Sequence, residues 1–150
     1  MRRLNNKGIS PVIATVILVA VAIAIAIAVA FWMTGIIGLF TRFEKLEITY
    51  IYAKAEDSTW TITLKVKNTG TADATIDNIF INGRPATEWT GASPSITPTE
   101  VTSGYTLSAG GEVEITITLN KSGEFVPGQS IEVKVHTASG QEYPKLTNLP

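Results

Sequence analysis

The sequence contains no cysteine and a single histidine, His136. The first absence excludes disulfides, thiolate metal sites and a cysteine nucleophile, and the second excludes a pair of histidine metal ligands. Basic and acidic side chains almost balance, at 12 against 13 of 150 residues, which argues against a nucleic-acid-binding protein. We therefore expect no metal site, no cofactor and no nucleic acid as a partner.

Charge is missing altogether from one part of the chain, because no charged residue occurs from Gly8 to Thr41. About 20 apolar residues span the hydrocarbon core of a bilayer as a helix. The segment Val12–Met33 meets this requirement with Thr15 as its only polar residue. It predicts a membrane-spanning helix, and the basic residues before it predict a cytoplasmic N-terminus with residues 41–150 outside. These basic residues are Arg2, Arg3 and Lys7.

Alanine alternates with isoleucine or valine from Ala22 to Ala30. Alternation ordinarily indicates a strand, but the length of the segment and its all-round apolarity favour a helix. Small residues four positions apart on a helix let neighbouring helices approach closely, although a plain lipid-facing anchor explains the same composition. The residues that we assign to helix packing are Ala20, Ala22, Ala24, Ala26, Ala28 and Ala30.

From Leu46 onward, apolar residues recur at every second position. Leu46, Ile48, Tyr50 and Tyr52 share one face of the first predicted strand, and we expect the two tyrosines in the core together with Trp60. Further strands of the same kind follow, and Asn82-Gly83 indicates a hairpin. Short strands with regular turns over about 105 residues predict an all-β, immunoglobulin-like sandwich head on the long N-terminal helix.

Residues 87–108 interrupt this pattern with ten serine or threonine residues and two prolines, which predicts a long surface loop. Trp89 is the aromatic residue of this loop that we would test for a contact role. Asn120-Lys121-Ser122 is an N-glycosylation sequon, and Asn120 is therefore a candidate glycan site.

No catalytic constellation is visible in the sequence. Glu112 and Glu114 share one strand face but have no acid or base partner that the pattern identifies, and a solvated strand face explains them equally well. His136 alternates with Val135 and is expected to point to solvent. We expect a protein that is not an enzyme.

The residues Lys7-Gly8-Ile9-Ser10-Pro11-Val12-Ile13, followed by an alanine-rich apolar helix, resemble the N-terminus of archaeal type IV pilins. The resemblance implies a leader peptide that a prepilin peptidase removes between Gly8 and Ile9, with Lys7 as the basic residue before the cut. It divides the chain into a leader (1–8), a hydrophobic helix (9–43) that spans the membrane before assembly and forms a filament core afterwards, and a β-sandwich head (44–150).

The same resemblance implies the partners and the location of the protein. Subunits are expected to polymerise through their helices into a helical homo-oligomer, an adhesion pilus on the cell surface. The implied partners are a prepilin peptidase, the pilus assembly machinery, the membrane, and surfaces or other cells. Two alternatives remain: a membrane-anchored extracellular binding module, and an archaellin-type subunit of a motility filament.

Overall fold

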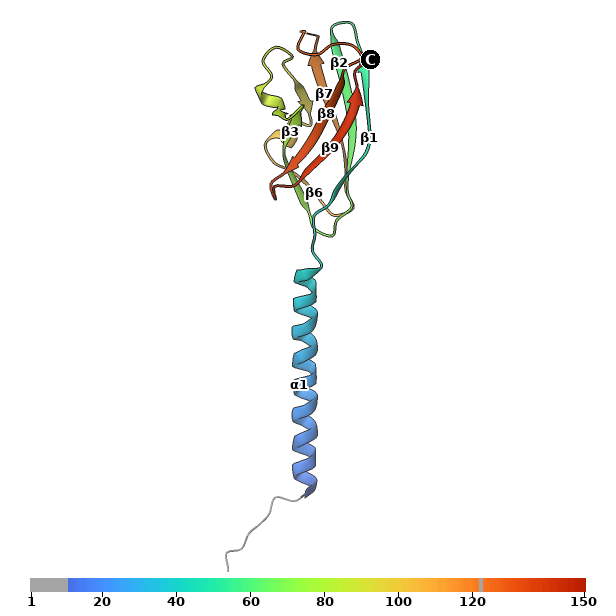
Figure 1. Ribbon diagram of the computed structural model, residues 1–150. Coiled ribbons are helices and arrows are strands. Elements are labelled where there is room, and N and C mark those ends of the chain that lie inside the picture. The colour runs from blue at the N-terminus through green and yellow to red at the C-terminus, as the bar shows by residue number, and fades with distance from the viewer. Residues whose placement is uncertain (1–10, 122) are drawn as a thin grey trace, which may run out of the picture. The chain divides into compact units, whose positions relative to one another are not determined.

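The computed structural model describes residues 11–121 and 123–150 and divides the chain into two compact units, Met1–Thr41 and Arg42–Pro150. The first unit contains one long helix and the second contains two antiparallel sheets (Figure 1). The prediction of an all-β sandwich head following a long hydrophobic helix is confirmed.

The helix α1 extends from Pro11 to Phe40. Proline is tolerated at the start because the first helical turn has no internal hydrogen-bond donors to lose. The last helical bond runs from the Thr41 N–H to the Ile37 carbonyl, at 3.1 Å. The helix thus ends three residues before the expected limit at residue 43, because the backbone of Phe43 is hydrogen-bonded to the sandwich instead.

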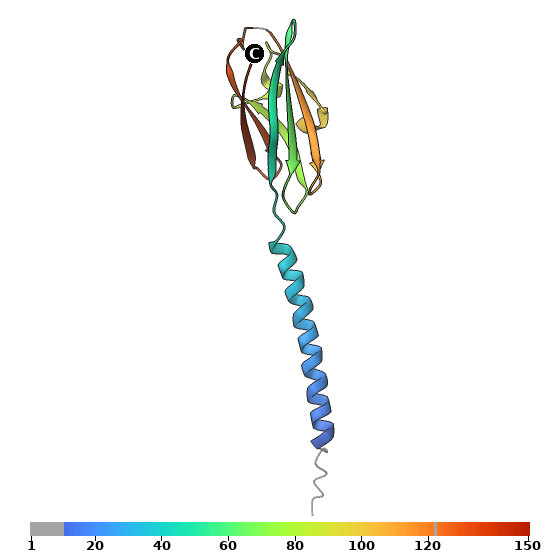
Figure 2. The ribbon, with the colours of Figure 1, turned by 90° about the vertical axis from the view of Figure 1, so that its right-hand side faces the viewer.

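One sheet of the sandwich has the strand order β1-β2-β7-β5, and the other has the order β4-β3-β8-β9, with β6 pairing to β3. All of these pairings are antiparallel. Figure 2 shows β1 and β2, in teal and green, side by side. The strands are β1 (Leu46–Ala55), β2 (Thr59–Asn68), β3 (Ala74–Ile81), β4 (Arg84–Pro85), β5 (Ser95–Thr97), β6 (Tyr105–Leu107), β7 (Glu112–Asn120), β8 (Ser130–Thr137) and β9 (Glu142–Asn148).

The hydrophobic core consists of the inward-facing residues of these strands. In the β2–β7 pair, Trp60 lies opposite Leu119 and Ile62 opposite Ile117, and these four side chains are 2% exposed or less. Between them, Thr61 and Thr118 are only partly buried, as the period of two predicts for the outer face. The largest fully buried side chains are Trp60, Phe125, Ile62, Leu64, Ile76, Ile79, Ile81, Ile115, Ile117, Leu119, Ile131 and Leu149.

A β-bulge in β1 reverses the side-chain alternation in the middle of the strand. Ile48 pairs with Val66 whereas Tyr50 pairs with Lys65, so Thr49 is one extra residue. Leu46 and Ile48 are buried, but Tyr50 and Tyr52 are 39% and 54% exposed. The prediction that the two tyrosines lie in the core is wrong, because an inserted residue moves every later side chain of the strand to the opposite face.

Asn82-Gly83 forms the predicted hairpin between β3 and β4, with positive φ angles of 49° and 79° that suit this tight turn. Residues 87–108 are more ordered than a surface loop. They include β5, the 3₁₀ helix η2 (Thr99–Thr102) and β6, and they contribute Ile96, Val101 and Leu107 to the core. The prolines and serines hid these short elements, because a strand of three residues shows too little alternation to be recognised.

Candidate functional site on the apolar helix

The surface of α1 is apolar on every side. Its described residues, Pro11–Phe40, include no charged side chain and no buried one, and the helix is long and apolar enough to span a membrane. The exposed fractions reach 71% for Leu18, 74% for Phe31 and 85% for Phe40. A surface of this kind marks a site of contact with lipid or with other proteins.

The length of α1 exceeds what a membrane requires. Thirty residues at about 1.5 Å per residue give a helix of about 45 Å, against a hydrocarbon core of about 30 Å. Roughly a third of the apolar helix therefore extends beyond the hydrocarbon if the helix stands upright. In that orientation the hydrocarbon core alone does not cover the whole site.

The helix offers almost no hydrogen bonding to a partner. The Thr15 hydroxyl donates to the Val12 carbonyl at 2.9 Å, and the Thr34 hydroxyl donates to the Ala30 carbonyl at 3.0 Å. Both hydroxyls are thus satisfied within their own helix. Association through the described part of α1 must rely on shape and apolar contact rather than on polar groups.

The alanines of α1 form two stripes on opposite sides of the helix. Successive residues are about 100° apart around a helix, so residues four apart differ by only about 40° and residues two apart by about 200°. Ala20, Ala24 and Ala28 therefore follow one side, and Ala22, Ala26 and Ala30 follow the other. Isoleucine and valine side chains form ridges between the two stripes.

Two shallow grooves accompany this arrangement. One is lined by residues from Ala14 to Ile25, including Ala22, and the other by residues from Thr15 to Ile23, including Ala20. The angular positions of the lining residues place the two grooves on roughly opposite sides of the helix. Each groove is of a kind that can receive the ridge of another apolar helix.

The outer face of the first sheet carries an exposed tyrosine pair beside a carboxylate. The rings of Tyr50 and Tyr52 stack with their centroids 6.0 Å apart, and the Tyr50 hydroxyl donates to Glu114 at 2.6 Å. This hydrogen bond to Glu114 raises the pKa of Tyr50 to about 12. The sequence did not identify the pair, since only the bulge places it on the surface.

Glu112 and Glu114 lie on one outer face, as strand alternation predicts, but they have different partners. Glu112 forms ion pairs with Lys65 at 2.6 Å and Lys67 at 3.2 Å. The hydrogen bond from Lys65, followed by that from Lys67, lowers the pKa of Glu112 below its ordinary value. The two carboxyl groups are therefore engaged separately, which does not suit a shared acid–base role.

His136 lies on the outer face of the second sheet, where its Nδ1 atom is 2.6 Å from Asp77 and its ring is 5.8 Å from that of Phe80. The side chain is 27% exposed, so it faces outward but packs against neighbours. Within residues 11–121 and 123–150, no group of three or more His, Asp or Glu residues is arranged to hold a metal.

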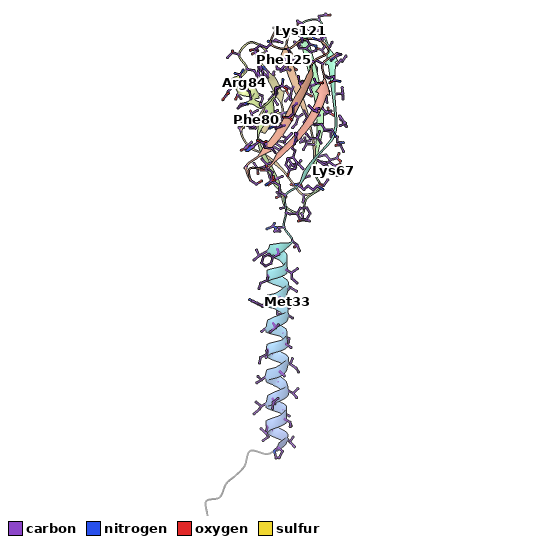
Figure 3. The ribbon with its side chains drawn as sticks, in the orientation of Figure 1. Met33, Lys67, Phe80, Arg84, Lys121 and Phe125 are labelled. Carbon is purple, nitrogen blue, oxygen red and sulfur yellow. The ribbon has the colours of Figure 1, made fainter. Side chains whose placement is uncertain are left out.

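Trp89 packs at the end of the sandwich near the C-terminus. Its ring centroid is 4.8 Å from that of Phe125, and the Arg84 guanidinium lies 4.5 Å from its ring. Figure 3 shows Arg84, Phe125 and Lys121 at this end and Lys67 at the other. These contacts give Trp89 a packing role that fastens its loop to the core.

The remaining predicted sites are placed as follows. Asn120 is exposed at the end of β7, but Ser122 of its sequon lies outside the described residues. The leader-cleavage residues Lys7, Gly8 and Ile9 also lie outside them. The six alanines assigned to helix packing are all exposed.

No protein-family profile matches this sequence, and no curated protein matches it. Solved structures do match. The archaellum periplasmic stator protein FlaG of Sulfolobus acidocaldarius is 20% identical with a TM-score of 0.49, and the match covers 69% of this chain and 99% of that one.

Two filament structures match a larger part of the chain. The archaeal flagellum of Methanospirillum hungatei strain JF1 is 18% identical with a TM-score of 0.46, over 92% of this chain and 88% of that one. The Iho670 flagellar-like filament is 13% identical with a TM-score of 0.40, over 93% and 98%. At these identities and scores the similarity is one of fold.

Proposed function

We propose that this chain is a structural subunit of an extracellular filament of the archaeal pilin and archaellin type. Subunits polymerise through their N-terminal helices, and the β-sandwich heads remain exposed. The observation that carries the proposal is α1 itself, which is about 45 Å long, uncharged and apolar on every side.

Such a helix requires a covered environment along its whole length. Moving a large apolar side chain out of water is worth about 1.5–3 kcal/mol, and α1 exposes more than ten such side chains. A membrane covers about 30 Å of the helix before assembly. A bundle of identical helices covers all of it, which explains why the apolar surface exceeds the thickness of a bilayer.

The two alanine stripes support an assembly that continues to grow. A helix with one small-residue face forms closed pairs, whereas a helix with two opposite faces can contact a different neighbour on each side. Contacts that join different faces of identical subunits generate closed rings or open helical arrays, depending on whether the rotation between subunits closes. The geometry of α1 therefore favours a filament core over an isolated dimer.

The proposal includes the maturation and the partners that the N-terminal motif implies. A prepilin peptidase cleaves between Gly8 and Ile9, so that the mature chain begins at Ile9. The cleavage chemistry belongs to that peptidase, and the subunit itself is not an enzyme. Assembly machinery then moves the chain from the membrane into a filament that contacts surfaces or other cells.

Two finer assignments satisfy this proposal, an adhesion pilus and an archaellin-type motility filament. The Ser10-Pro11-Val12-Ile13 block supports the pilus. We give the motility filament equal weight, since the helix-plus-sandwich architecture suits both and the two filaments named above are flagellar by description. Deleting the gene separates them, because loss of surface attachment indicates a pilus and loss of swimming indicates a motility filament.

The proposal is tested on material sheared from the cell surface. We expect electron microscopy to show filaments, and intact mass with N-terminal sequencing to show a chain that starts at Ile9. Mass in excess of the mature chain would report glycosylation, for which Asn120 is the candidate site. A chain that retains Met1 and stays in the membrane fraction without filaments would instead identify an anchored binding module.

A further inference from the structure

The chain enters the sandwich through a short segment that a distant turn holds tightly. We call residues 43–45 the lead-in segment and residues 68–72 the clamp turn. Six hydrogen bonds join them. The Lys45 carbonyl accepts from the N–H groups of Thr69 and Gly70 at 2.8 and 3.1 Å, and from the Thr69 hydroxyl at 3.3 Å. The Phe43 carbonyl accepts from the N–H groups of Thr71 and Ala72 at 2.9 and 3.1 Å. The Phe43 N–H donates to the Thr71 hydroxyl at 3.1 Å.

The geometry of these bonds is unusual for a connection between two strands. Four successive backbone N–H groups converge on only two carbonyl oxygens of the lead-in segment. Consecutive N–H groups that point to one side form a concave donor site, which usually receives an anion. Here the site receives the backbone of the chain at the point where it leaves the helix and enters the head.

Gly70 is required by the close approach of the two backbones. A Cβ atom at this position would lie 2.4 Å from the Phe43 carbonyl oxygen and 2.6 Å from the Lys45 nitrogen. The requirement is steric, because both obstructing atoms belong to the backbone and cannot rotate away. Any other residue at position 70 must push the lead-in segment out of the clamp turn.

A buried asparagine fastens the clamp turn to the rest of the sandwich. Asn68 is 0% exposed, and its amide nitrogen donates at 2.9 Å both to the Ala72 carbonyl and to the Leu107 carbonyl of β6. Its side-chain oxygen accepts from the Gly70 N–H at 2.9 Å. The Asn68 backbone is also bonded to Gly110 and Gly111 before β7. The turn is thus connected to both sheets.

We infer that the clamp turn is a mechanical clamp, which receives tension from the lead-in segment and distributes it to both sheets before β1 is disturbed. Its physiological role rests on the proposed function, because the chain is pulled at this point only if α1 is held in a filament or a membrane. Without the clamp, tension would act directly on Leu46 at the start of β1 and separate β1 from β2 one pair at a time.

The test is force spectroscopy on single full-length chains in detergent micelles. Since the sequence has no cysteine, attachment points can be introduced uniquely. In one geometry the chain is pulled at Arg42→Cys and Pro150→Cys, so that the load passes through the clamp turn. In the second it is pulled at Asp57→Cys and Pro150→Cys. The load then enters at the turn between β1 and β2, at the opposite end of this hairpin from the Leu46–Asn68 pair beside the clamp turn.

Two clamp variants and one matched control are compared in both geometries. Gly70→Ala expels the lead-in segment, and Thr71→Val removes the acceptor of the Phe43 N–H while keeping the side-chain shape. Thr106→Val makes the same exchange in β6, where the Thr106 hydroxyl contacts only that of Thr75 at 3.2 Å among the bonds described. The urea midpoint of each variant, measured without load, reports its overall stability.

We expect Gly70→Ala to lose the first rupture event when the chain is pulled at residue 42 and to behave normally when it is pulled at residue 57. Thr71→Val should rupture at least about fivefold faster at equal load in the first geometry alone, because the loss of the bond from the Phe43 N–H by itself removes about 1 kcal/mol. Thr106→Val should change neither geometry.

The inference is overturned if both clamp variants rupture as the unmodified chain does when pulled at residue 42. Equal weakening in the two geometries, together with a lower urea midpoint, also overturns it, because this result assigns the turn to general stability. The experiment uses isolated chains, so its outcome does not depend on whether filaments form. Failure of the proposed function would leave the mechanical result intact and remove only its physiological setting.

Discussion

At the scale of single residues, Thr49 decides what the outer face of the first sheet displays. It is the extra residue of the β1 bulge, and its hydroxyl donates to the Lys65 carbonyl at 3.1 Å. The reversal that it causes brings Tyr50 within hydrogen-bond distance of Glu114. A pair of exposed aromatic rings beside a carboxylate is thus the product of one inserted residue.

The Tyr50 hydroxyl provides a direct measure of this local geometry. We expect Glu114→Gln to lower the pKa of Tyr50 from about 12 toward its ordinary value of 10.0, because the variant removes the carboxylate that accepts the hydrogen bond. Tyrosinate absorbance recorded during an alkaline titration measures the change. Glu112→Gln is the matched control and should leave the last tyrosine transition almost unchanged, because Glu112 raises this pKa less than its other neighbours do. A titration of Glu114→Gln identical to that of the unmodified chain would contradict the geometry.

The same bond predicts how stability depends on pH. The folded pKa of Tyr50 is raised above its unfolded value, so the protonated tyrosine is favoured by folding. The contribution is complete below pH 10.0 and is lost as the pH rises toward about 12. Urea midpoints measured at pH values across this window should fall more steeply for the unmodified chain than for Glu114→Gln, and parallel curves would refute the link.

At the scale of elements, the bulge sets the register of β1 against the core. Removing Thr49 forces a choice between keeping Leu46 and Ile48 buried and keeping Ile51 and Ala53 against the core. We expect the deletion to lower the free energy of unfolding by about 3 kcal/mol or more, since exposing a large apolar side chain costs about 1.5–3 kcal/mol. Urea unfolding followed by circular dichroism measures this loss. Thr49→Ser keeps the bulge and serves as the control, and a deletion as stable as this control would show that β1 has no fixed register.

The helix has a corresponding test at its two alanine stripes. We expect Ala24→Leu and Ala26→Leu, on opposite sides of α1, each to prevent filament growth. Overpacking of a close contact costs about 1–3 kcal/mol, which raises the concentration needed for assembly by about 5-fold to 150-fold. Sedimentation of filaments from cells expressing each variant measures assembly, and membrane fractionation confirms that the apolar substitutions leave insertion intact.

Ile25→Leu, on a ridge between the stripes, is the matched control and should assemble normally because it conserves volume. If Ala24→Leu fails and Ala26→Leu assembles, the helix has one contact face and forms closed pairs. If both variants assemble as the control does, the stripes are not contact faces and the assignment of the six alanines to helix packing is wrong.

At the scale of the whole molecule, the sequence predicts the division into a helical unit and a β-sheet unit. The two units differ in amino-acid composition and in the spacing of their apolar residues, and both can be seen in the sequence alone. A charge-free run and a change from all-round apolarity to alternation are local patterns, and they predicted the helix and the sandwich correctly. The same is true of the Asn82-Gly83 hairpin, since its residues carry their own backbone preference.

The features that the sequence did not reveal depend on partners that are distant along the chain. Either face of the second half of β1 could face the core, since one carries Tyr50 and Tyr52 and the other carries Ile51 and Ala53. Only the pairing with β2 decides between the two faces. The composition of residues 68–71 predicts a turn. Nothing in that local sequence indicates that the turn is hydrogen-bonded to the lead-in segment, which lies about 25 residues earlier. For the same reason the helix was predicted to continue to Phe43.

The central claim is that α1 is the buried core of a filament and that the head is its exposed surface. A thiol-accessibility measurement tests it most directly, because the chain contains no cysteine of its own. Single variants Ala24→Cys and Lys54→Cys are purified as surface filaments and treated with a bulky water-soluble maleimide. We expect the thiol at position 54 to react at once and the thiol at position 24 to react only after detergent dissociates the filaments. Equal labelling of both thiols in intact filaments, or the absence of the chain from every surface filament, would contradict the account.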